Sequence, residues 1–158
     1  MKDFVLMLML LLSGFSDNQK PDLIIASIQR TAEPVIINAQ HCVEVPIKVV
    51  VKNNGNTKAG VFKVGIEYLL DGRTFTVAFT VPGEGNSWYP YTDGPMPAGQ
   101  SVSFKGKVTF HPTMHNVTVR LKANADSCSG DEFMPDYCRV KENKESNNAS
   151  SYLRVTLP

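Results

Sequence analysis

The sequence predicts an all-β fold, a sandwich of seven antiparallel strands. Apolar residues recur at every second position through most of the chain, which is typical of strands with one buried face. Residues typical of tight turns separate these stretches. After residue 16 no segment has helical periodicity for more than two turns. Strands with one apolar face each bury those faces when two sheets pack together, so we expect a β-sandwich.

Composition and charge narrow the classes of function. The chain has 158 residues, which is enough for one domain, and 42% of them are hydrophobic. Its 16 Lys and Arg residues against 15 Asp and Glu residues give a formal net charge of +1. Such a balance provides no long-range attraction for nucleic acid or anionic lipid. We therefore expect no nucleic-acid partner.

Residues 1–16 are predicted to be a secretory signal peptide. A charged start precedes the apolar run Phe4–Leu12, which is too short for the roughly 20 residues that span a bilayer. Gly14-Phe15-Ser16 supplies small residues for cleavage after Ser16. A buried N-terminal strand or helix is the alternative. Cleavage would leave residues 17–158 as a single secreted domain with no membrane span, and residues 17–22 as a polar arm.

The predicted strands follow from alternation of apolar and polar residues, although the first, residues 23–28, is less regular. The most regular strand runs from Cys42 to Lys52, where every second residue is apolar. Asp71-Gly72 is a two-residue hairpin signal, and Asn53–Asn56 ends a strand with residues that tolerate positive φ. In chain order the seven predicted strands cover residues 23–28, 42–52, 62–70, 75–81, 102–110, 117–125 and 153–157.

Five segments of the chain resemble the CARDB domain, the cell-adhesion-related domain found in bacteria. In chain order they are Pro21–Ile25, Val51–Gly55, Tyr68–Gly72, Pro97–Val102 and Glu142–Ser150. The resemblance covers Pro21 to Leu157 and implies an immunoglobulin-like or fibronectin-III-like sandwich. It also implies a secreted or surface accessory module without catalytic residues. Two segments depart from the family pattern, namely the long loop 82–96 and the inserted segment 126–138.

Strand direction predicts that three loops share one end of the sandwich. Strands that alternate in direction bring residues 53–60, 82–99 and 126–148 to the same end, as in antibody variable domains. Two of these loops hold the candidate binding residues, which are Trp88, Tyr89, Tyr91, Phe133 and Tyr137. Aromatic side chains in polar loops provide rigid contact area for sugars or proteins. The alternative is that Trp88 and Tyr91 fold down to cap the core.

The loop 126–148 also holds a candidate disulfide and candidate metal ligands. Cys128 and Cys138 bracket a polar segment and are expected to form a disulfide in an oxidising compartment, a pair that does not include Cys42. The carboxylates suited to Ca²⁺, which prefers oxygen ligands in flexible loops, are Asp126, Asp131, Glu132 and Asp136. Their spacing differs from that of an EF-hand loop, and a solvated acidic turn is the alternative. Apart from this calcium, no cofactor is expected.

The motifs do not indicate an enzyme. The three histidines, His41, His111 and His115, fall at the end with short connections, and no Gly-x-Ser-x-Gly turn or phosphate-binding glycine loop occurs. The sequence therefore predicts a secreted or surface binding and adhesion module whose partner is a protein or carbohydrate on a cell surface. The alternative is an extracellular structural subunit that assembles with copies of itself by strand addition at a sheet edge. In that case residues 17–22 would be the added segment.

Overall fold

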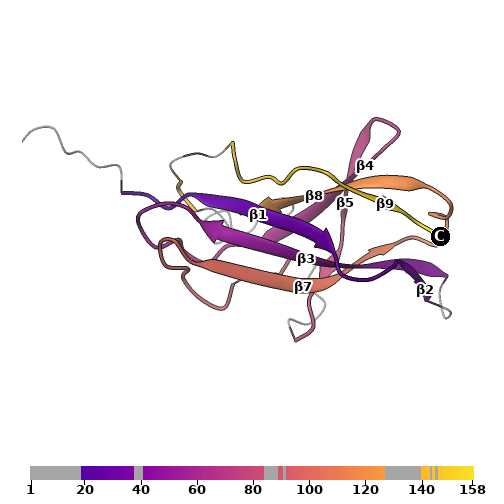
Figure 1. Cartoon of the computed structure of the whole chain (residues 1–158), viewed down its shortest axis with the longest axis horizontal. Helices are drawn as coiled ribbons and strands as arrows, with labels where there is room; N and C mark the ends of the chain where they lie inside the picture. Colours follow the sequence, from indigo (N-terminus) through magenta and orange to yellow (C-terminus); the bar gives the residue numbers. More distant parts are fainter. Residues whose placement is uncertain are drawn as a thin grey trace, which may run out of the picture.

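The computed structural model describes residues 19–37, 41–83, 89–90, 92–126, 140–142, 144 and 146–158. Within these ranges the chain forms two antiparallel sheets that pack face to face (Figure 1). The all-β prediction is confirmed, since every regular element described is a strand. None of the described segments is a helix long and apolar enough to cross a membrane. The predicted signal peptide, residues 1–16, lies outside the described residues.

The nine strands found among the described residues divide between the sheets as in an immunoglobulin sandwich. The first sheet has the order β1-β3-β7-β6, with β2 also paired to β3. Its strands are β1 (Leu23–Arg30), β2 (Val35–Ile37), β3 (Cys42–Asn53), β6 (Phe79–Thr80) and β7 (Ser101–Phe110). The second sheet has the order β5-β4-β8-β9. Its strands are β4 (Val64–Leu70), β5 (Arg73–Val77), β8 (Thr118–Ala125) and β9 (Leu153–Thr156). The two orders correspond to the ABED and CFG sheets of that fold, with β5 added beside β4.

The structure divides one predicted strand and adds another, so its described residues hold nine strands where seven were predicted. The predicted strand 75–81 becomes β5 in the second sheet and β6 in the first, with the crossing at Ala78. Val77 and Phe79 are nevertheless both buried, at 6% and 0% exposure, because the two sheets face the same core. The added strand is β2, in which Val35 and Ile36 are both exposed. Its sequence, Val-Ile-Ile, has no alternation of apolar and polar residues that would predict a strand.

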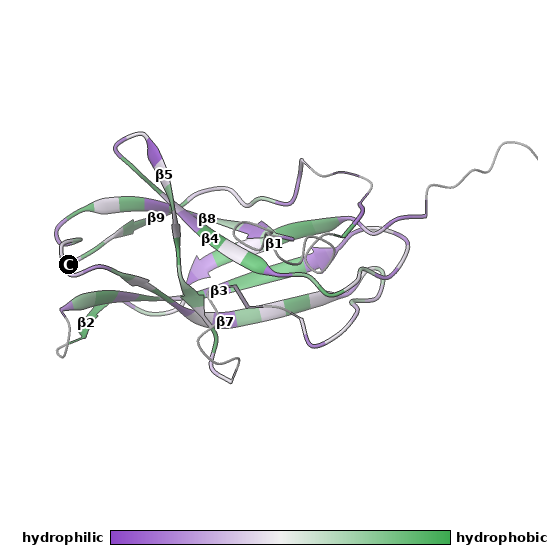
Figure 2. Ribbon diagram, turned by 180° about the vertical axis from the view of Figure 1, so that it is seen from behind, coloured by the Kyte–Doolittle hydropathy of each residue, from purple (hydrophilic) through white to green (hydrophobic). Residues whose placement is uncertain are grey.

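Inward-facing side chains of both sheets form the core. The five inward apolar residues of β3, all 0% exposed, are Val43, Val45, Ile47, Val49 and Val51. Apolar and polar residues alternate in the same way along β7 (Figure 2). Phe62 packs edge-on against Phe104 with ring centroids 6.4 Å apart, which joins the sheets near one end.

Pro46 lies in β3 at the position where the neighbouring chain leaves the sheet. Proline has no N–H to donate and is normally excluded from central strands. β1 pairs with β3 only from Ile47 onward, and β2 pairs with it only as far as Glu44. Thr31 N donates to Pro46 O at 2.9 Å. The missing N–H therefore costs no ladder hydrogen bond at this position.

Candidate functional site

We call the end of the sandwich where β1 and β7 begin, and where β3 and β8 end, the long-loop end (Figure 1). Parts of all three predicted loops meet there. Ala59 and Met96 form an isolated antiparallel bridge, which joins the loop after β3 to the loop before β7. Ala125 N donates to Asn148 O at 2.8 Å, which holds the segment before β9 against the end of β8. The loop before β7 starts elsewhere, because β6 is only two residues long and lies beside the second half of β7, away from the long-loop end.

Asn53 joins three segments at the long-loop end. It is the last residue of β3, and it is fully buried. Its Oδ1 accepts hydrogen bonds from Asp22 N at 3.2 Å and from Gly55 N at 3.1 Å. Its Nδ2 donates to Thr57 O at 2.7 Å and to Met96 O at 3.1 Å. One amide thus uses both of its donor hydrogens and accepts two further bonds, which fixes the N-terminal segment and two loops relative to β3.

Glu142 links the start of β1 to the segment before β9. It is 5% exposed. Its Oε2 accepts from Leu23 N at 2.5 Å, and its Oε1 accepts from Asn148 Nδ2 at 2.9 Å. Asn147 Nδ2 donates to Asp22 Oδ1 at 2.9 Å, which reinforces the same junction. Because a buried carboxylate requires hydrogen-bond donors, we interpret this junction as structural.

The N-terminal segment is packed against the loop after β3. Asn54 N donates to Asp22 O at 2.7 Å. A Cβ at Gly55 would lie 2.5 Å from Lys20 O and 2.6 Å from Asp22 N, so glycine is required for this close approach. Lys20 to Asp22 therefore belong to the fold. The prediction that residues 17–22 form an available arm is wrong for this part, and the first two residues of that arm lie outside the described residues.

The structure describes one of the five candidate binding residues, Tyr89, which is half-buried. The other four, which lie outside the described residues, are Trp88, Tyr91, Phe133 and Tyr137. The loop 82–99, which carries Trp88, Tyr89 and Tyr91, is attached beside β4. Val64 N donates to Pro90 O at 2.8 Å, and Thr92 N donates to Phe62 O at 3.1 Å. These two backbone bonds fix the stem of this loop near the long-loop end.

The stem of the loop 126–148 is also fixed, but most of its candidate residues are not described. Asp126 Oδ2 accepts from Val140 N at 2.7 Å, which closes the base of the loop. Two predictions for this loop concern residues outside the described ones, namely Asp131, Glu132 and Asp136 as calcium ligands and Cys128 with Cys138 as a disulfide. In the ranges that the structure describes, no three His, Cys, Asp or Glu side chains gather as a metal site. Calcium binding therefore stays a prediction.

The sequence showed the polar residues of these junctions but not their burial. Glu142 and Asn148 lie in the segment with the best match to the CARDB domain, and Asn53 lies in another matching segment. Their presence in those segments was the available signal. Thr92, which is 7% exposed and accepts from Phe62 N at 3.4 Å, has no such signal because it lies in the long loop.

No family model and no curated protein matches the chain. Among solved structures, the CARDB domain of a Pyrococcus furiosus protein, in complex with di-metal ions, is similar with 17% identity and a TM-score of 0.49. That alignment covers 90% of this chain and 97% of the other.

A Bacillus subtilis protein assigned as a lipoprotein is similar with 12% identity and a TM-score of 0.43. The alignment covers 87% of this chain and 37% of the other. The first of these two structures is a domain of the family that the sequence segments resemble. Because both TM-scores lie below 0.5, the fold class given above rests on the strand order and sheet pairing of this chain.

Proposed function

We propose that this chain is a secreted or surface-exposed, non-enzymatic binding module whose long-loop end contacts a protein or carbohydrate partner. One observation carries this proposal. The stems of the two loops that hold the candidate aromatic residues are fastened by hydrogen bonds to the same end of a packed sandwich. Loops on a rigid scaffold lose less conformational entropy on binding than free loops do, which favours contact there.

The buried amide of Asn53 and the buried carboxylate of Glu142 support the same proposal. Each joins a loop stem to the beginning of β1 or the end of β3 through hydrogen bonds with low exposure. Buried polar groups that are fully paired favour one arrangement of the chain over alternatives. They explain how long loops with polar sequences keep defined starting and ending points.

The test is a double variant, Trp88→Ala with Tyr91→Ala, measured for both binding and stability. The probes are a glycan array and a panel of immobilised extracellular proteins. We expect binding to weaken by about 2 kcal/mol, or roughly 30-fold in Kd, with little change in Tm. Tyr152→Ala is the matched control, because Tyr152 is 47% exposed and lies next to β9, outside these loops. A large drop in Tm with unchanged binding would instead make the two aromatics a cap on the core.

Secretion is tested separately by intact-mass analysis of the protein from its native host. We expect a mature chain that starts near Asp17, because the small residues before it suit signal-peptide cleavage. A full-length mass in the soluble cytoplasm would contradict this part of the proposal and leave the binding surface to be tested by itself.

A further inference from the structure

β7 has one edge that is only partly paired. Asn53 N donates to Gln100 O at 3.0 Å, so even-numbered residues along β7 direct their backbone groups toward β3. Odd-numbered residues face the other way, as the bond from Thr80 Oγ1 to Lys107 O at 3.4 Å shows. On that side β6 pairs only through Phe79 and Thr80. Within the described ranges, no strand pairs with this edge from Ser101 to Lys105.

Pro82 explains why the pairing stops. In the register of β6 with β7, Thr80 lies opposite Lys107, so continuation of the ladder would place Pro82 opposite Lys105. Proline has no N–H to donate to the Lys105 carbonyl. Gly83 follows with φ of 93°, which directs the chain away from extended geometry. The N–H and C=O groups on the open edge are therefore left for another donor and acceptor.

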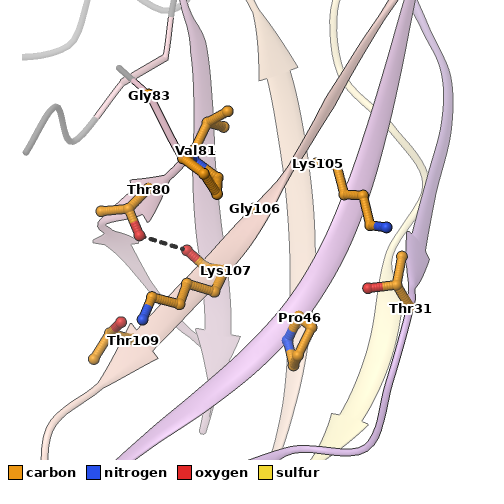
Figure 3. A pocket seen from close by; sticks show the side chains of 10 residues that line it. Thr31, Pro46, Thr80, Val81, Gly83, Lys105, Gly106, Lys107 and Thr109 are labelled. Atoms are coloured by element: carbon orange, nitrogen blue, oxygen red, sulfur yellow. Dashed lines mark hydrogen bonds between the residues drawn. The ribbon is translucent and has the colours of Figure 1, made fainter. Parts of the chain in front are cut away.

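A groove lies where the ladder stops. It has a volume of about 830 Å³, and its walls include Pro82. Val81 and Lys105, which also line it, are labelled in Figure 3. Figure 3 shows Lys105 and Lys107 extending from β7 on the side where Pro46 lies. The walls of this groove combine apolar atoms with the ammonium groups of Lys105 and Lys107. This combination suits a peptide in which an apolar side chain is followed by a carboxylate.

The positive charge in this groove is only partly neutralised. Lys107 forms an ion pair with Glu44 at 2.5 Å. Lys105 lies directly opposite Lys48 on the outer face of the sheet, and neither has an ion-pair partner in the part of the chain that the structure describes. Like charges at directly opposite positions destabilise a sheet, so a bound anion there would relieve repulsion.

A second groove marks the other end of the open edge. It has a volume of about 440 Å³, and its lining includes Asp93, Pro95, Ser101 and Val102. The open edge from Ser101 to Lys105 spans about 14 Å, at roughly 3.4 Å per residue. A bound segment would therefore meet positive charge at one end and the exposed carboxylate of Asp93 at the other, which sets its direction.

We propose that the open edge of β7 binds an extended peptide as an added strand, with a carboxylate of the peptide at Lys105 and Lys48. Main-chain hydrogen bonds to the odd-numbered residues of β7 provide affinity, and the two grooves with opposite charge provide specificity. The proposal does not rest on the aromatic loops of the long-loop end, because it uses a different surface.

The experiment selects peptides from a random heptapeptide library displayed on phage, with the full chain immobilised. Selected peptides are then synthesised and titrated calorimetrically at low and high salt. We expect sequences that combine β-branched residues with Asp or Glu, and affinity that falls as salt rises. Lys105→Glu is expected to weaken binding about tenfold or more, because it reverses the charge in the groove.

Backbone pairing is tested by matched variants. Ser103→Pro removes an N–H that faces the open edge and no ladder bond to β3, so binding is expected to fall at least about tenfold. Ser103→Ala keeps that N–H and is expected to bind within about twofold of the parent. Because the proline variant could be unstable, each selected peptide is also made with N-methyl groups at alternate residues, which should remove binding to the unchanged protein.

The proposal is overturned if no selected peptide depends on both Ser103 and Lys105. It is also overturned if the N-methylated peptides bind as well as the parents, or if the chain forms a dimer that Ser103→Pro abolishes, because the edge would then belong to a second copy. Peptide binding that survives Trp88→Ala with Tyr91→Ala supports a site separate from the long-loop end.

Discussion

The Asn53→Ala substitution tests whether a single buried amide holds the long-loop end together. Four hydrogen bonds depend on this side chain, two accepted by Oδ1 and two donated by Nδ2. Each contributes a net of about 0.5–1.5 kcal/mol to stability. Asp22 N and Gly55 N lie in part-buried bonds, so water can replace some of what is lost there. Met96 O is bonded in a buried setting and would lose this donor, although it would keep the bond from Ala59 N at 2.9 Å.

These contributions lead us to expect a loss of about 3 kcal/mol in the free energy of unfolding. For a chain of this size that corresponds to a decrease in Tm of roughly 10 °C. Urea denaturation and calorimetry measure the two quantities. Hydrogen exchange should also show faster exchange at Gly55 and Asp22, whose N–H groups lose their acceptor.

Asn54→Ala is the matched control, because Asn54 is the next residue, is exposed, and makes its described hydrogen bond through the backbone. It is expected to change stability by less than about 0.5 kcal/mol. If Asn53→Ala changes stability by less than about 1 kcal/mol, the amide is not the junction described above.

Two further predictions concern β6 and the cysteines. A Cβ at Gly106 would overlap Thr80 O, so Gly106→Ala should separate β6 from β7 and speed hydrogen exchange of their amides. Gly60→Ala is the control and should change little, because open space surrounds Gly60. Equal effects of the two substitutions would refute this prediction. Non-reducing peptide mapping of the secreted protein should find Cys128 linked to Cys138, and a peptide that joins either of them to another cysteine would contradict the pairing.

Most of the fold follows from the sequence because burial of one strand face leaves a period of two. The regular alternation after Cys42 predicted β3 closely, with its inward residues. The same pattern could not predict the crossing at Ala78, because Val77 and Phe79 are buried in one core from two different sheets. Alternation shows that a side chain is inside but not which sheet carries it.

The candidate site was less predictable, since its geometry depends on contacts between distant segments. The bond from Leu23 N to Glu142 joins residues 119 apart in the chain. The turn-forming run that starts at Asn53 was correctly predicted to end a strand, since β3 ends at Asn53. The open edge of β7 could not be foreseen, because it depends on where Pro82 falls in the register with Lys105.

The placement of the first and last described strands has a mechanical consequence. β1 begins at the long-loop end and β9 ends at the opposite end of the sandwich, so tension between them acts along the strands (Figure 1). A strand pulled along its own axis is held by all its ladder pairs at once, seven for β1 with β3 and four for β8 with β9. Under such a load β9 should shear off first. The bond between Leu23 and Glu142 then passes part of the force directly between the first strand and the segment that precedes β9.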